Sequence, residues 1–198
     1  MTSKKNEPTV YQLKITLRYI KPPIWRRVQV QSSTTLSHLH LIIQAAMGWY
    51  NCHLHQFSIQ GIEYGQLEPN YGFEDEELRD EKLVQLNQVV KQEKSKFFYT
   101  YDFGDDWSHE ILVEKILPQD PEISYPLCLK AKRACPPEDC GGPWGYAEFL
   151  EAIQNPQHSE HENLLEWIGG DFNSEASDLN KINRRLSDPE IFLYEQDF

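Results

Sequence analysis

The strongest constraint on the fold is the segment from Tyr99 to Glu110, in which aromatic and polar residues alternate up to a Gly104-Asp105 pair. Alternation with a period of two is typical of a β-strand, and a Gly-Asp pair between two such runs is typical of a tight turn. We therefore expect residues 97–117 to form an antiparallel hairpin. The residues expected to share the face of this hairpin that packs on a helix are Tyr99, Tyr101 and Phe103.

The end of this hairpin carries more charged side chains than a turn requires, namely Asp102, Asp105, Asp106 and His109. If the turn has two central residues, Asp102 and His109 are diagonal neighbours on one face of the sheet. If the loop has three residues, Asp102 faces Ser108, and Asp102 and His109 lie on opposite faces. A site at the hairpin end therefore depends on the register of the two strands.

The N-terminal half predicts two strands, a helix and a third strand. Residues 10–19 and 24–30 alternate as two strands do. Lys21-Pro22-Pro23 separates them, because proline donates no ladder hydrogen bond and restricts the residue before it. A helix capped by Thr34 or Thr35 then runs to Gly48, and residues 53–60 form the third strand. This order of elements is that of a β-grasp-like opening.

The C-terminal part changes to prolines, cysteines and glycines and then to helical periodicity. We expect one helix with Pro143 in its first turn, a second that ends at Gly169-Gly170, and a third capped by Asn173. The fold class is α+β, with an N-terminal mixed sheet and a helical C-terminal portion. The expected organisation is a flexible arm at 1–8, a sheet domain with one main helix at 9–120, and loop and helices at 121–198 packed on the sheet as one unit.

Charge and cysteine content limit the partners and the compartment. The chain has 19 basic and 31 acidic residues and a net charge of −12, which disfavours nucleic acid unless a local basic patch overrides it. No apolar run approaches the roughly 18 residues that span a bilayer, and the first eight residues are polar. We therefore expect a cytoplasmic protein without a membrane partner, in which Cys128, Cys135 and Cys140 form no disulfide.

Acidic residues also gather between Gln66 and Lys82, where we expect a solvated loop that contributes to a partner surface. The residues concerned are Glu68, Glu74, Asp75, Glu76, Glu77, Asp80 and Glu81.

Two further groups of residues are candidates for chemistry. His53 and His55 are two positions apart, so in a strand they share a face, and with Asp102 and His109 they would suit zinc, manganese or iron. The alternative is one packed and one solvent-facing histidine. Glu138 and Asp139 precede a helix, where the helix dipole alone favours them. The complete candidate polar site is His53, His55, Asp102, Asp105, Asp106, Trp107, His109, Glu138 and Asp139.

The chain resembles the plasmid pRiA open-reading-frame-three-like family over about residues 9–187. The segments that carry the resemblance are 23–27, 46–49, 53–57, 101–107, 135–142 and 169–172. The resemblance implies an α+β fold with a sheet domain and a helical C-terminal portion. Members are also named as insertion-element passenger proteins with a resolvase-like label, although neither a serine-recombinase pattern nor a helix-turn-helix is present in these residues.

Two hypotheses of different classes follow. The first is an accessory or binding protein of the plasmid or insertion-element passenger type, whose partner is a protein or a small ligand. The second is a metal-dependent, hydrolase-like enzyme that uses His53 and His55 with Asp102 and His109. We favour the first because no nucleophile, base and electrophile can be assembled with assigned roles. No cofactor is assigned, and a divalent metal belongs to the second hypothesis.

Overall fold

The computed structural model describes residues 8–67 and 78–190. The first seven residues and most of the acidic stretch, including Glu68 and residues 74–77, lie outside the described residues.

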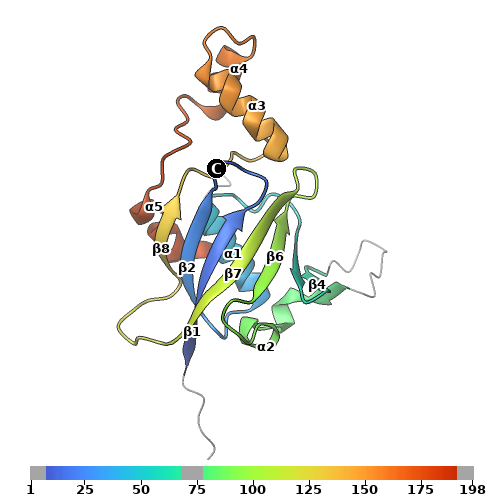
Figure 1. Ribbon diagram of the computed structural model, residues 1–198, viewed down its shortest axis with the longest axis vertical. Helices are drawn as coiled ribbons and strands as arrows, with labels where there is room; N and C mark the ends of the chain where they lie inside the picture. The colour runs from blue at the N-terminus through green and yellow to red at the C-terminus, as the bar shows by residue number, and fades with distance from the viewer. Residues whose placement is uncertain (1–7, 68–77, 191–198) are drawn as a thin grey trace, which may run out of the picture.

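One mixed, eight-stranded sheet forms the body of the molecule, with strand order β5-β4-β3-β6-β7-β1-β2-β8 (Figure 1). All neighbouring strands are antiparallel except β4 and β5. The strands are β1 Thr9–Leu17, β2 Trp25–Gln31, β3 His55–Ile59, β4 Ile62–Gly65, β5 Leu78–Asp80, β6 Lys96–Tyr101, β7 Trp107–Pro118 and β8 Leu127–Lys132. The α+β class predicted from the sequence is confirmed.

The helix α1, at Leu36–Met47, covers one face of the sheet, and α3 and α4 lie together beyond one end of the strands (Figure 1). The remaining helices are η1 Glu81–Leu83, α2 Leu86–Val89, α3 Gly142–Gln154, α4 His161–Ile168 and α5 Leu179–Leu186. In the described parts of the chain, no helix is long and apolar enough to cross a bilayer.

The sequence predicted the end of α1, one of its two candidate N-caps and the place of Pro143 in α3, and the structure agrees. The Thr35 side chain accepts a hydrogen bond from the His38 N–H, and α1 ends where Gly48 adopts a φ of 102°, in the left-handed region. Pro143 lies in the first turn of α3. The prediction for α5 is wrong, because Asp178 caps this helix, while Asn173 accepts a hydrogen bond from the Glu175 N–H in a local turn.

The opening order of two strands, a helix and a strand is confirmed. Within the sheet, β3 pairs with β4 and β6, so that the hairpin of β6 and β7 separates β3 from β1. The strand β8 comes from the segment expected to be loop and helices, and it completes the other edge of the sheet beside β2.

The core fills the space between the sheet and α1. Residues of alternate positions on β1, β2, β6 and β7 point into it, together with Leu36, Leu39 and Ile43 of α1. Tyr99 and Tyr101 belong to this face as predicted, and the Tyr99 hydroxyl contacts His40 and Gln44 of α1. The prediction for Phe103 is wrong, because this residue lies in the hairpin loop and its side chain is exposed.

Leu39 tests the packing of α1 because its side chain is completely buried. Leu39→Ala should lower the free energy of unfolding by about 2–5 kcal/mol, through lost apolar burial and the cavity left behind. Urea denaturation measures the change. The control Leu83→Ala removes a leucine that is 78% exposed and should change the free energy by no more than about 0.5 kcal/mol. Equal effects of the two substitutions would contradict this position of α1.

Candidate functional site

The hairpin end forms a loop of residues 102–106, longer than either register considered from the sequence. Tyr101 pairs with Trp107 and Tyr99 with His109, so Asp102 has no partner across the ladder. Instead Asp102 has a φ of 56°, and its side chain accepts a hydrogen bond from the Gly104 N–H at 2.9 Å. Both predicted registers are therefore wrong, because the ladder ends at Tyr101 and Trp107. Asp102 lies in the loop and stabilises it.

His53 lies beside two carboxylates from distant parts of the chain. Its Nε2 is 3.6 Å from Asp102 Oδ2 and 3.1 Å from Asp139 Oδ1. The imidazole is not aligned with either carboxylate, and Nε2 is buried without a hydrogen-bond partner. One ligand atom from each residue lies within 4.8 Å of the other two, which is the spacing of a potential metal site.

His55 and His109 do not belong to this cluster. The strand β3 begins at His55, so His53 precedes the strand, and the two histidines are not on one strand face. His55 points into the core, where its Nε2 contacts Glu81 Oε2 at 2.8 Å and its ring stacks on that of His40 at 3.4 Å. The His53/His55 part of the predicted metal set is therefore wrong in this structure.

His109 is fully buried beneath the sheet, where its ring packs edge-on against Trp49. Burial lowers the pKa of His109 to about 4. Trp107 is likewise a core residue, and its Nε1 is buried without a hydrogen-bond partner. Both residues therefore support the site from within the core and do not face a ligand.

The Glu138 carboxylate joins the segment before α3 to the end of α1 and to the hairpin. Glu138 Oε1 accepts hydrogen bonds from the Tyr50 N–H at 2.8 Å and from the Tyr101 hydroxyl at 3.0 Å. Burial raises the pKa of Glu138 above its ordinary value. Next to it, the Trp49 indole donates to the Pro136 carbonyl at 3.0 Å.

Asp105 fastens the hairpin end to the start of α3. Its carboxylate accepts a hydrogen bond from the Gly141 N–H at 3.1 Å, and its carbonyl lies so close to Gly142 that a Cβ there would collide with it. The four motifs at 46–49, 53–57, 101–107 and 135–142 therefore meet in one place. Of the candidate residues, His53, Asp102, Asp105, Glu138 and Asp139 take part in these contacts.

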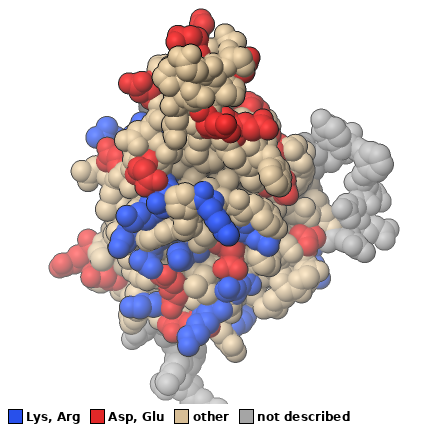
Figure 2. All heavy atoms as spheres, turned by 45° about the horizontal axis from the view of Figure 1, so that its top comes forward, with Lys and Arg blue, Asp and Glu red and all other residues tan. Residues whose placement is uncertain are grey.

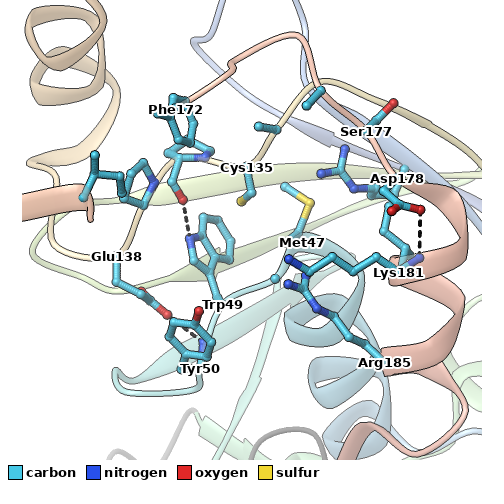
Figure 3. A pocket seen from close by; sticks show the side chains of 18 of the residues that line it. Met47, Trp49, Tyr50, Cys135, Glu138, Phe172, Ser177, Asp178, Lys181 and Arg185 are labelled. Carbon is cyan, nitrogen blue, oxygen red and sulfur yellow. Dashed lines mark hydrogen bonds between the residues drawn. The ribbon is translucent and has the colours of Figure 1, made fainter. Parts of the chain in front are cut away.

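A cleft of about 730 Å³ opens beside this junction, between the end of α1 and the segment leading into α5 (Figure 3). Trp167 and Phe172 give it an apolar wall, while Glu138 and Asp139 line its margin nearest to His53. Lys181 and Arg185, one turn apart on α5, extend into the cleft together near Met47 (Figure 3). Asp178 also lines the cleft beside Lys181, so this end carries three cations and one acid, the opposite end is acidic, and the wall between them is apolar.

Three cations line the cleft, namely Arg26, Lys181 and Arg185, and the two arginines also contact the C-terminus of α1. Arg26 Nε donates to the Ala46 carbonyl at 2.9 Å, and the Arg185 guanidinium lies against Gly48. Cations at this position interact favourably with the helix dipole. Burial lowers the pKa of both arginines from the ordinary value. Lys181 is the exposed cation of the group.

A buried polar network lies behind the site and joins α1 to β6. The Tyr99 hydroxyl accepts from Gln44 Nε2 at 3.0 Å and contacts His40 Nδ1 at 2.8 Å, while His40 Nε2 contacts Asn51 Oδ1 at 2.7 Å. A neutral His40 fits both of its contacts: the Tyr99 hydroxyl donates to His40 Nδ1, and His40 Nε2 donates to Asn51 Oδ1. Burial also favours the neutral form, because it lowers the pKa of His40 well below the ordinary value.

Sequence reasoning missed several residues of this region. Glu81 was predicted to lie in a solvated acidic loop, but it is 2% exposed and pairs with His55. Lys181 and Arg185 were not predicted as site residues, although their spacing of four on one helix places them side by side. None of the four cysteines, all of which the structure describes, forms a disulfide.

This fold and site define a class of α+β proteins in which a hairpin end, a histidine segment and a Pro/Cys/Gly loop form one junction beside a cleft. A family model described as Plasmid pRiA4b ORF-3-like protein matches residues 9–181, and the chain belongs to that family.

Two relatives agree with this assignment. The "Uncharacterized protein y4hQ" of Sinorhizobium fredii (strain NBRC 101917 / NGR234) is 40% identical over 182 residues, which are 91% of this chain and 92% of that protein. The crystal structure titled "Protein of Unknown Function MM3350 from Methanosarcina mazei Go1" has a TM-score of 0.80 and 39% identity, and covers 88% of this chain and 98% of that one. The fold is thus shared with the Methanosarcina mazei protein.

The buried histidines predict a loss of stability in acid. The pKa of His109 in the folded chain is below the value of about 6.5 expected when it is unfolded, so the unfolded chain binds more protons between these values. The free energy of unfolding should therefore fall as the pH is lowered from about 6.5 towards 4, by up to about 1.4 kcal/mol per pH unit for this group. His109→Phe should reduce this slope in urea denaturation series at pH 7 and pH 5. His158→Gln, which removes a partly exposed imidazole, is the control, and parallel pH profiles of wild type and His109→Phe would contradict the assignment.

Proposed function

We propose that this protein is a binding protein, an accessory module of its plasmid-associated family, whose ligand occupies the cleft beside α5. The observation that carries the proposal is the combination of a 730 Å³ cavity with a basic end and an aromatic wall. Binding pockets for small ligands have volumes of about 300–1,000 Å³ and combine apolar walls with a few placed polar groups.

The residues of the cleft indicate what the ligand carries. Lys181 and Arg185 favour a carboxylate or phosphate group, because a charge-assisted hydrogen bond to either is strong. Trp167 and Phe172 favour an adjoining apolar or aromatic group. The ligand is then a small molecule, or a side chain and carboxylate of a partner protein.

Thiol chemistry in the cleft is disfavoured by the surroundings of its cysteines. Burial raises the pKa of Cys140 to about 12 and also raises that of Cys135, which lines the cleft. A thiol with a raised pKa is a poor nucleophile at neutral pH. The cleft therefore supports binding better than covalent catalysis.

The cleft can be tested with an aromatic carboxylate and its neutral analogue. N-acetylphenylalanine should quench or shift the tryptophan fluorescence and saturate, whereas its amide should bind about tenfold more weakly because the contact with the cations is lost. Lys181→Ala should weaken binding of the carboxylate about tenfold and leave binding of the amide unchanged.

The matched control is Arg184→Ala, which removes an exposed cation of the same helix that does not line the cleft. It should bind both compounds as the wild type does. Phenyl phosphate serves as the second anionic probe. If neither anionic probe binds, or if Lys181→Ala binds them as the wild type does, the cleft is not the ligand site.

A divalent cation site is the second candidate, and it is favoured by the grouping of His53, Asp102 and Asp139 within 4.8 Å. One imidazole and two carboxylates suit zinc or manganese, and a bound metal could activate water in a hydrolase-like reaction. This version of the enzyme hypothesis uses neither His55 nor His109.

Calorimetric titration with Zn²⁺ and Mn²⁺ tests this site directly. We expect one ion per chain, with binding lost in His53→Ala and weakened at least tenfold in Asp139→Asn. The control His158→Ala removes a partly exposed histidine outside the cluster and should bind as the wild type does. Unchanged binding in His53→Ala would remove the metal site.

A further inference from the structure

The face of the sheet opposite α1 carries a row of cations that comes from distant parts of the sequence. The strand register places Lys130 opposite Arg27, Arg27 opposite Lys14, Lys14 opposite Leu112, and Leu112 opposite Lys96. Four of these five residues are basic, and they cross β8, β2, β1, β7 and β6. With neighbouring strands about 4.8 Å apart, the row extends over roughly 19 Å.

The alternation of each strand points this row away from the core. Lys14 and Arg27 are half-buried between fully buried neighbours, and Lys96 and Lys130 are exposed. In Figure 2, Lys and Arg side chains gather in the middle of one face, with acidic side chains between and around them. This open face is therefore locally basic in a chain whose net charge is −12.

Two of the four cations of the row, Arg27 and Lys96, are paired with acids, so the four cations and these two acids together leave a net charge of +2. Glu114 binds Arg27 through two contacts, with Arg27 Nη2 at 2.6 Å from Glu114 Oε1, and Glu110 contacts Lys96 at 3.1 Å. A groove of about 630 Å³ at the β8 end of the row adds Lys94 and Lys115 to Arg27 and Lys130, with Glu114 as its acid. The groove therefore has an excess of positive charge.

Aromatic rings lie in the row next to the cations. The register aligns Lys132, Trp25, Thr16, Glu110 and Phe98 across the same five strands. Lys14 and Arg27 lie 5.2 and 5.3 Å from the centre of the Trp25 ring, and the Arg18 guanidinium lies 5.0 Å from that of Phe98. Cations thus lie beside the half-buried ring of Trp25 and the exposed ring of Phe98 on one open sheet surface.

We propose that the open face of the sheet binds single-stranded nucleic acid, with phosphates along the row of Lys130, Arg27, Lys14 and Lys96 and bases on Trp25 and Phe98. A basic surface that follows the backbone, combined with aromatic rings on which bases stack, is how proteins bind single strands without strong sequence preference. An acidic protein segment would use the cations but not the rings. The local charge overrides the expectation from net charge, because interactions beyond about 8–10 Å are screened at physiological salt.

The experiment uses the full chain and fluorescence anisotropy of labelled dT20 and U20 oligonucleotides. We expect saturable binding at low salt, with the logarithm of the association constant falling linearly with the logarithm of the salt concentration. Lys14→Ala/Lys130→Ala should reduce this slope by about 1.4, because each phosphate contact to a single strand contributes about 0.7. Trp25→Leu should weaken binding about tenfold and leave the slope unchanged, since stacking is not a counterion effect.

The matched control is Lys82→Ala/Arg184→Ala, which removes the same charge at exposed positions outside the open face and should bind as the wild type does. Circular dichroism of each variant verifies that it folds. Absence of binding to both oligonucleotides, or equal losses in the control and in Lys14→Ala/Lys130→Ala, overturns the proposal. Tighter binding to polyglutamate or to duplex DNA than to the single strands overturns it in favour of an acidic protein or a duplex.

The outcome is independent of the cleft. Lys181→Ala should leave oligonucleotide binding unchanged, and Trp25→Leu should leave binding of N-acetylphenylalanine unchanged. Failure of one proposal is therefore distinguishable from failure of the other.

Discussion

The arrangement around the cleft depends on one buried guanidinium. Arg26 is 2% exposed, yet its three hydrogen bonds all go to main-chain carbonyls, those of Ala46, Trp25 and Lys132. A buried charge is tolerated only where its donors are satisfied, and here the acceptors lie at the end of α1 and on the last two strands of the sheet. The same side chain therefore fixes where α1 ends relative to β2 and β8, and the cleft begins at that point.

Near Arg26, three carboxylates hold the loops of the junction in place. Glu138 binds the segment after α1 and the hairpin, Asp105 binds the start of α3, and Asp102 closes its own loop. Each accepts a hydrogen bond from a main-chain N–H, as a carboxylate does well in partly buried positions. Asp102 and Asp105 of the hairpin end thus have structural roles, and within the described residues His53, Asp102 and Asp139 are grouped as potential ligands of an ion.

The two faces of the sheet differ in chemistry because of the alternation of their strands. The α1 face contains the apolar core and the neutral His40 network, while the open face contains the row of cations and its aromatic neighbours. The net charge of the chain describes neither face, because strand pairing aligns cations on the open face although the chain has 31 acidic and 19 basic residues. The cleft and the open face are accordingly separate surfaces with different ligand preferences.

Local chemistry in the sequence determined the elements of this protein: the hairpin from its alternation, the start of α1 from Thr35, its end from Gly48, and the first turn of α3 from Pro143. These features act within a few residues, so they can be read without knowing the fold. Which residues meet was decided only by the tertiary structure. A five-residue loop moved Asp102 out of the ladder, the late start of β3 separated His53 from His55, and Glu81 was buried by a partner 26 positions away. The same holds for the basic row, whose members lie on four strands and become neighbours through cross-strand register, a property of the whole sheet that no single segment specifies.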